Sequence, residues 1–289
     1  MELKVLISVI IGILFVMGVC SYLYFMDKYD KESKRLLLLL FFAGVISGLL
    51  IFFLKEISGK GLILAFGNMV TVGLDTSLVF KSNIARITWT FINNFVVMSL
   101  VPILVKFIFA YVLTHKNKNF NSLFDGIIYL AYVFLGALLS ETICYAILNG
   151  WDLFLFSLLT VACIDVFSAI IIGYYYTNWY TWKIASSVEE ILNERKMIPE
   201  KNKVKFKTWI LKGLAFGVII STIYQYCGNK IYGLILVVAA LIFAIRKVND
   251  ISRKDMADEN LVYNILIKHY PSLSEKKEET INIINERTN

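Results

Sequence analysis

The apolar run DGIIYLAYVFLGALLSETICYAIL, residues 125–148, decides the fold of this chain. Its charged residues are Asp125 at the start and Glu141 in the interior. A helix needs about 20 mostly apolar residues to cross a bilayer, so this run is long enough to span one. Together with six further apolar runs it predicts about seven spans: Val5–Phe25, Leu36–Leu54, Thr90–Leu113, Gly126–Leu148, Leu153–Tyr176, Thr208–Cys227 and Ile231–Ile245. The predicted fold is therefore an all-α polytopic membrane helix bundle, with short cytoplasmic amphipathic helices.

Composition agrees with a membrane protein and excludes several other classes. Hydrophobic residues make up 58% of the chain and charged residues 18%, whereas soluble domains hold about 45–50% and about 25%. The formal charge of +7 comes mainly from short segments between the apolar runs, a distribution that does not indicate a nucleic-acid surface. The four cysteines show no paired spacing, so the sequence predicts neither a disulfide framework nor a zinc motif.

The distribution of basic residues predicts the orientation. They concentrate in the first, third and fifth loops and after the last span, at Lys28, Lys31, Lys34, Arg35, Lys116, Lys118, Lys183, Arg195, Lys196, Lys201, Lys203, Lys205, Lys207, Arg246 and Lys247. By the positive-inside rule we expect a plasma-membrane protein with its N-terminus outside and its C-terminus in the cytoplasm. The second loop is the exception, because Lys55 and Arg86 fall on the expected outer side. Its apolar part, residues 61–80, is an interfacial helix, a re-entrant helix or an eighth span, and these alternatives stay open.

Two parts of the chain are expected outside the bilayer core. We divide the chain into a transmembrane domain, residues 1–247, and a charged cytoplasmic tail, residues 248–289. In the fifth loop, apolar residues from Ile184 to Leu192 recur at helical spacing, and Ser187 with Glu190 fits a capping box at the start of a helix. We expect this helix to lie on the membrane or on the tail.

Three ionisable residues fall inside predicted spans, where each requires a partner or a function. At about 1.5 Å per residue, Lys106 lies roughly 10 Å from the cytoplasmic end of its span, Asp165 roughly 17 Å and Glu141 roughly 23 Å. Lys106 can therefore pair with Asp165, with Glu141 about one turn farther out. The arrangement is either a structural ion pair or a polar cavity with a working carboxylate, which Thr142, Ser221 and Gln225 would help to line. No histidine lies in a span, so we expect no metal site and no cofactor.

Two segments resemble the PrsW-type intramembrane proteases, a branch of the CAAX-protease and bacteriocin-immunity superfamily. Asp125-Gly-Ile-Ile-Tyr129, then Leu135-Gly136 and Glu141-Thr-Ile-Cys-Tyr145, resemble the family motif DGIVYGALVGLGFALVENILY. Tyr29-Asp-Lys-Glu32 resembles the family's YxKEP entry to its second helix. The resemblance extends to about Ile245 and implies a membrane-embedded protease that cleaves a single-pass membrane protein, such as an anti-sigma factor. It also implies a site of glutamates and histidines on the core helices.

The glutamate positions of that site are largely replaced here. The family's EExxK motif aligns with Lys106 at its lysine, but its two glutamate positions hold Pro102 and Ile103. The FxxxEN motif aligns with Glu141 at its glutamate, and Thr142 replaces the asparagine. One glutamate of the implied set therefore remains.

The histidine positions are replaced as well. The family's third motif places a histidine eight residues before a glycine, and the corresponding residues are Asp165 and Gly173. A histidine followed four residues later by asparagine aligns best with Ser221 and Gln225. The implied catalytic residues reduce to Glu141 and Asp165.

Three functions fit this sequence. The first is a catalytically inactive PrsW-like protein that binds or regulates a membrane-spanning protein or peptide. A divergent active protease would instead use Glu141 and Asp165 on an intramembrane water, and it needs the two carboxylates within about one water of each other. The third is an ion- or proton-coupled carrier with Lys106, Glu141 and Asp165 as a relay.

Overall fold

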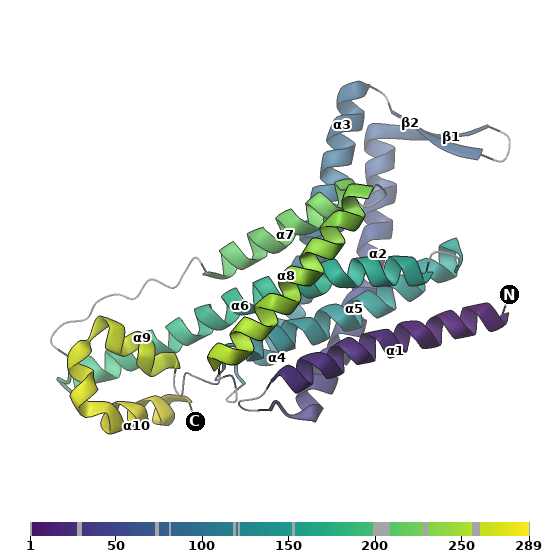
Figure 1. Cartoon of the computed structure of the whole chain (residues 1–289). Helices are drawn as coiled ribbons and strands as arrows, with labels where there is room; N and C mark the ends of the chain where they lie inside the picture. Colours follow the sequence, from purple (N-terminus) through teal and green to yellow (C-terminus); the bar gives the residue numbers. More distant parts are fainter. Residues whose placement is uncertain are drawn as a thin grey trace.

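The computed structural model describes residues 2–27, 31–72, 75–80, 82–117, 120, 122–151, 154–198, 209–227, 231–255 and 261–288. Long helices dominate these residues, as Figure 1 shows. The elements are α1 (Glu2–Met26), α2 (Lys34–Phe66), β1 (Gly67–Val72), β2 (Asp75–Phe80), α3 (Asn83–Phe91), η1 (Ile92–Leu100), α4 (Val101–Thr114), α5 (Asp125–Asn149), α6 (Phe154–Glu194), α7 (Trp209–Cys227), α8 (Ile231–Asp255), α9 (Leu261–His269), η2 (Pro271–Lys276) and α10 (Lys277–Thr288).

The expected all-α membrane bundle is confirmed. Within the described residues, six helical segments are long and apolar enough to cross a membrane: Val5–Met26, Lys34–Ser58, Asn83–Thr114, Asp125–Leu148, Phe154–Glu194 and Trp209–Cys227. The seventh predicted span, Ile231–Ile245, lies within α8. The chain is therefore a multi-pass helical protein that occupies a lipid bilayer.

The segment after the second span differs from all three expected forms. Residues 61–66 continue α2, and the chain then forms an antiparallel hairpin of β1 and β2, with Gly67 opposite Phe80 and Val72 opposite Asp75. The described residues of this segment form neither an interfacial helix, a re-entrant helix nor an eighth span. The sequence reading relied on average hydrophobicity, which does not separate a short apolar helix from two short strands.

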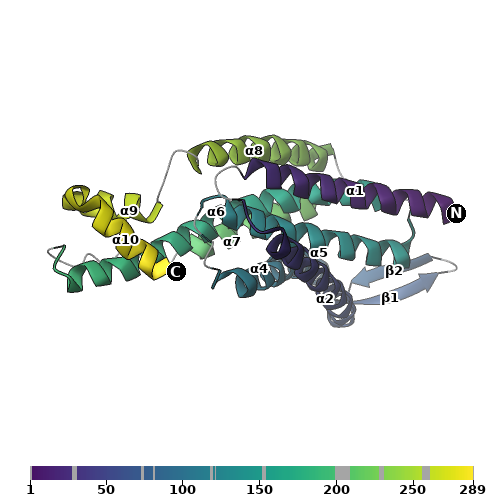
Figure 2. The same cartoon turned by 90° about the horizontal axis from the view of Figure 1, so that it is seen from below.

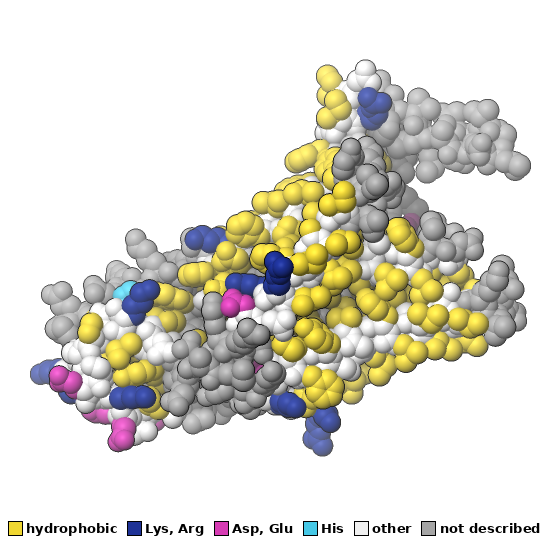
Figure 3. All heavy atoms as spheres, viewed as in Figure 1, with side chains coloured by type: hydrophobic (Ala, Val, Ile, Leu, Met, Phe, Trp, Pro, Cys, Tyr) yellow, Lys and Arg dark blue, Asp and Glu magenta, His cyan; other side chains and the backbone are white. Residues whose placement is uncertain are grey.

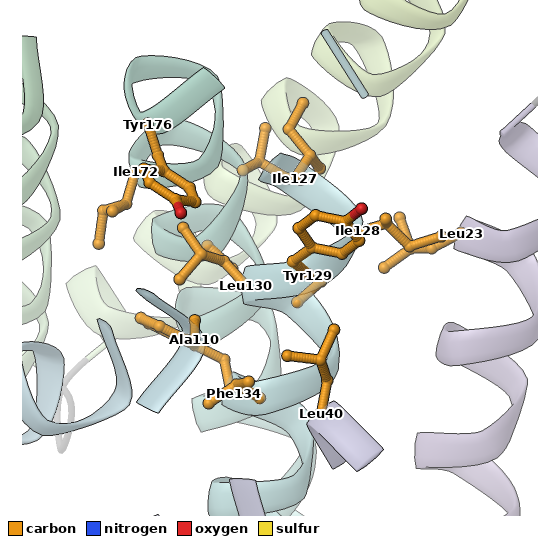
Figure 4. Packing of buried hydrophobic residues seen from close by; sticks show 14 of the residues in the cluster. Leu23, Leu40, Ala110, Ile127, Ile128, Tyr129, Leu130, Phe134, Ile172 and Tyr176 are labelled. Carbon is orange, nitrogen blue, oxygen red and sulfur yellow. The ribbon is translucent and has the colours of Figure 1, made fainter. Parts of the chain in front are cut away.

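Helix α5 forms the centre of the bundle and packs against α1, α2, α4 and α6. Its residues from Ile127 to Leu135 are almost all fully buried, and Figure 4 shows Ile127, Ile128, Tyr129 and Leu130 surrounded by side chains of the neighbouring helices. Because this helix is buried on nearly every face, its sequence is apolar all round rather than amphipathic. Any polar group on it therefore has to be satisfied within the protein, by α5 itself or by a neighbouring helix.

Glycines bring the neighbouring helices close to α5. A Cβ atom on Gly48 would lie 2.2 Å from the Ala137 carbonyl oxygen, so α2 crosses α5 at near-backbone contact. A Cβ atom on Gly173 of α6 would lie 2.5 Å from the carbonyl oxygen of Gly126. Small residues allow such close approach between membrane helices. Two glycines that match the family motifs, Gly126 and Gly173, therefore meet each other where α5 and α6 cross.

The predicted fifth-loop helix is a continuation of α6, which runs unbroken to Glu194. The proposed capping box does not form, since Ser187 Oγ donates to the carbonyl of Ile184 inside the helix. The expected packing on the tail does form, because Val188 and Leu192 share a buried cluster with residues of α9, η2 and α10. Figure 2 shows α9 and α10 beside this end of α6.

The chain ends lie at opposite ends of the bundle (Figures 1 and 2). We call the end that carries Lys31, Lys34, Lys183, Lys212 and Lys247 the basic end. Lys183, Lys212 and Lys247 each lie over an aromatic ring there, at 5.0–5.6 Å from the ring centroid. It is the end that the charge distribution predicts to face the cytoplasm.

Candidate functional site

Lys106 and Asp165 form an ion pair between α4 and α6. The Lys106 ammonium lies 2.6 Å from Asp165 Oδ2, and only 4% of the lysine side chain and 13% of the aspartate side chain are exposed. The ammonium also lies over the Phe134 ring of α5, 4.9 Å from its centroid. This is the contact that the depths of the two residues along their spans predict.

Glu141 has a partner that the sequence reading missed. Lys55 of α2 donates a hydrogen bond to Glu141 Oε1 of α5, and both side chains are nearly buried. We assigned Lys55 to an outer loop, whereas α2 continues through it to Phe66. Depth along the helix would have revealed the pair, because Lys55 lies about 28 Å from the start of its span and a lysine stem can reach back to Glu141 at roughly 23 Å.

The two pairs belong to one cluster, which we call the charge quartet: Lys55, Lys106, Glu141 and Asp165. Both Glu141 and Lys55 act electrostatically on Asp165. The four residues come from four helices, α2, α4, α5 and α6, and their formal charges cancel. Removing a charge from water costs several kcal/mol, which the opposite charge offsets only at close contact. The quartet therefore satisfies each charge inside the bundle.

Each carboxylate of the quartet keeps one oxygen without a hydrogen bond to the described part of the chain. Lys55 contacts Oε1 of Glu141, and Lys106 contacts Oδ2 of Asp165. The second oxygen of each remains able to accept from a water. Chemically, the cluster can hold charge in place, and its second oxygens can accept hydrogen bonds from a water.

The polar residues expected to line a cavity behave differently from one another. Thr142 Oγ1 donates to the Leu138 carbonyl one turn back, at 2.7 Å, so its hydroxyl is used within α5. Ser221 and Gln225 are half-buried on α7. These three residues are not joined to the quartet.

The positions that the resemblance assigns to a glutamate pair lie in the apolar core. Pro102 is buried where η1 passes into α4, and Ile103 is 3% exposed. The preceding segment, η1, is a π-helix, a form that is rare and often found near functional sites. Pro102 and Ile103 lie just after the end of η1 and about one turn before Lys106 on α4.

A second buried polar network joins the two segments that carry the family resemblance. Tyr129 of α5 donates to Glu32 Oε1, and Asn117 Nδ2 donates to the Tyr129 hydroxyl at 2.7 Å. Asp125 accepts from the backbone N–H and the hydroxyl of Ser122, at 2.8 and 2.7 Å. The sequence alone does not show that these two segments are in contact. Residues 28–30, which belong to the first of these segments, lie outside the described residues.

The histidines lie away from the quartet. His115 follows the last residue of α4, and its ring contacts the Tyr111 carbonyl, while His269 ends α9 and packs edge-on against Trp182. Across the described residues, no group of three His, Cys, Asp or Glu side chains is placed to hold a metal ion.

One curated protein is similar to this chain over part of its length. The protease PrsW of Bacillus subtilis (strain 168) is 26% identical to it over 156 residues, which are 54% of this chain. These residues are 61% of that protein, so the chain spans less than two thirds of the length of the relative it matches. No profile of a known protein family matches the chain, and no solved structure is similar to it. The similarity supports the PrsW-like relationship that the motifs around Asp125 and Glu141 indicate.

Proposed function

We propose that this PrsW-like membrane protein works without catalysis and binds or regulates a membrane-spanning partner. The observation that carries the proposal is that a lysine ammonium occupies each of the two intramembrane carboxylates, Glu141 and Asp165. These are the only two residues that the family resemblance leaves as candidates for activating a water.

The chemistry of a general base explains why these contacts matter. A base must accept a proton from water in the transition state, so its charge has to be available at the reacting oxygen. In a low-dielectric interior, a lysine at contact distance attracts the carboxylate strongly and holds it in a fixed position between two helices. Glu141 and Asp165 are both held in this way, so each is better suited to fixing helices than to moving protons.

The replaced positions support the same conclusion. Pro102 and Ile103 add no acid next to Lys106, and both pack in the apolar interior. Lys106 would then be an unpaired buried cation if Asp165 did not stand opposite it. Asp165, at the position of the family's histidine, thus balances the charge of Lys106, which matches the family's lysine.

A divergent active protease is the second candidate, and one observation favours it. Glu141 lies near enough to Asp165 for its charge to act on it, so the two carboxylates belong to one cluster. Each also keeps one oxygen without a hydrogen bond to described residues. In this case the lysines would position the carboxylates rather than neutralise them.

A comparison of protein termini in native membranes separates the two candidates. It uses wild type, a deletion strain, Glu141→Gln, and the double variant Lys55→Met with Glu141→Gln, which removes the carboxylate without leaving a lysine unpaired. Glu56→Gln serves as the matched control, because Glu56 follows Lys55 on α2 and is not part of the quartet. Expression of every variant is checked in the same membranes.

If the protein is not catalytic, all strains give the same set of termini. New N-termini within or near transmembrane segments that occur in wild type and Glu56→Gln, and vanish in both Glu141 variants, would instead establish an active protease with Glu141 in its site.

A further inference from the structure

A cavity of about 640 Å³ lies between α1 and α2, against the α5 side chains of Tyr132 and Leu139. Its back wall is buried, with Val16 fully covered, whereas Met17, Leu38 and Phe42 at its rim are more than half exposed. The exposed rim faces away from the bundle, where the bilayer surrounds these helices. The cavity is therefore a groove that opens sideways to lipid.

The groove has one polar end. Among the described residues, Lys34 at the first turn of α2 is the only charged one that lines the groove, and Ser21 and Tyr24 of α1 also line it. Lys31 lies over the Tyr24 ring, 5.3 Å from its centroid, which adds a second cation at the same end. This is the basic end of the bundle, and Figure 3 shows most of the Lys and Arg side chains in view toward the left and lower parts of a largely hydrophobic face.

We propose that this groove holds an anionic phospholipid, with its phosphate at Lys34 and an acyl chain along the apolar wall. The lining residues of α1 extend from Ile13 to Phe25, which is about 18 Å of helix. One leaflet of a bilayer with a hydrocarbon core of about 30 Å measures about 15 Å, so the groove matches the length of one leaflet. Basic pockets between membrane helices are a known way to recognise anionic head groups.

The size of the groove favours a lipid over a partner helix. A transmembrane helix is about 30 Å long, whereas the α1 residues that line the groove, from Ile13 to Phe25, cover about 18 Å. A partner helix would also need a groove that crosses both leaflets, whereas this one ends near Ile13. The lipid site is therefore separate from whatever surface holds the membrane-spanning partner of the proposed function.

The test uses full-length protein purified in detergent, with dioleoylphosphatidylglycerol or dioleoylphosphatidylcholine added. Bound lipid is counted by native mass spectrometry, and the apparent unfolding temperature is measured at each lipid concentration. Lys34→Gln removes the charge at the groove. Lys212→Gln is the matched control, because Lys212 is an exposed lysine at the basic end, on the first turn of α7, and lies over the Trp209 ring.

We expect wild type to retain phosphatidylglycerol in preference to phosphatidylcholine and to be stabilised by it. Lys34→Gln should weaken phosphatidylglycerol binding about fivefold, which is the effect of one lysine near an anionic surface, and Lys212→Gln should not. Equal losses in both variants, or no preference for the anionic lipid, would overturn the proposal.

Crosslinking locates the bound lipid. A photoreactive residue introduced at Met17 should capture phosphatidylglycerol, and Ser21→Trp, which fills the groove beside Lys34, should abolish this capture. Capture of a polypeptide in place of lipid at this position would mean that the groove receives a membrane helix. Unchanged lipid capture in the Ser21→Trp variant would mean that the lipid lies outside the groove.

Discussion

The ion pair between Lys106 and Asp165 makes a quantitative prediction about stability. Lys106→Met leaves a buried carboxylate without its partner, and Asp165→Asn leaves a buried ammonium beside a neutral amide. Breaking a buried pair from one side costs about 3 kcal/mol or more, because the remaining charge is uncompensated. The double variant removes both charges together, so it should cost at most about 3 kcal/mol rather than the sum of about 6. The coupling energy is then at least about 3 kcal/mol.

This value separates a paired charge from an ordinary polar contact. Hydrogen bonds between membrane helices contribute about 0.6 kcal/mol on average and about 1.7 at most. A coupling well above about 2 kcal/mol therefore requires that Lys106 and Asp165 are both ionised and in contact. The contact distance of 2.6 Å and the 4% exposure of Lys106 place the pair in this stronger class.

The measurement is reversible unfolding in mixed micelles, followed by tryptophan fluorescence for wild type, both single variants and the double variant. Lys106→Met combined with Glu286→Gln is the control cycle, because Glu286 is an exposed residue of α10 with no partner in the quartet. The control coupling should be near zero. A coupling below about 1 kcal/mol between Lys106 and Asp165 would refute the structural role of the pair.

Three further predictions test the packing around this site and the tail. Gly173→Val should prevent folding, because a Cβ atom at this position already overlaps the backbone of α5. Size-exclusion chromatography measures the amount of folded protein, which should fall. Tyr270→Phe removes the hydrogen bond to buried Glu189 and should weaken tail docking by about 1–3 kcal/mol, seen as faster proteolysis after α8. Arg195→Ala breaks only an exposed pair with Glu286 and should change the free energy of unfolding by less than about 1 kcal/mol.

The spans and one ion pair could be predicted from the sequence for a simple physical reason. A bilayer imposes a length and a polarity on each helix, so apolar runs of the right length are spans. The same constraint makes every buried charge conspicuous and assigns it a depth. Lys106 and Asp165 fall within reach of each other by this measure, and the structure places them in contact.

Other features depend on contacts that no local pattern encodes. The sequence predicts Lys55 in a loop, because the apolar run of the second span ends at Leu54. In the structure α2 continues through Lys55, whose charge is paired with Glu141. The bond between Glu32 and Tyr129 joins residues 97 positions apart, and only the crossing of helices brings them together. The prediction of a capping box at Ser187 was wrong because it relied on a local pattern alone. This pattern is typical of a helix start, but here it lies inside the longer helix α6.

The quartet also changes the meaning of the one glutamate that matches the family motif. A glutamate in the middle of a membrane span is costly, so its presence normally indicates a function that needs it. Here Lys55 supplies a second explanation, because Glu141→Gln would leave that lysine buried and unpaired. The pairing with Lys55 is therefore enough to account for Glu141. Catalysis needs separate support, and the variant that removes Lys55 and Glu141 together provides the means to look for it.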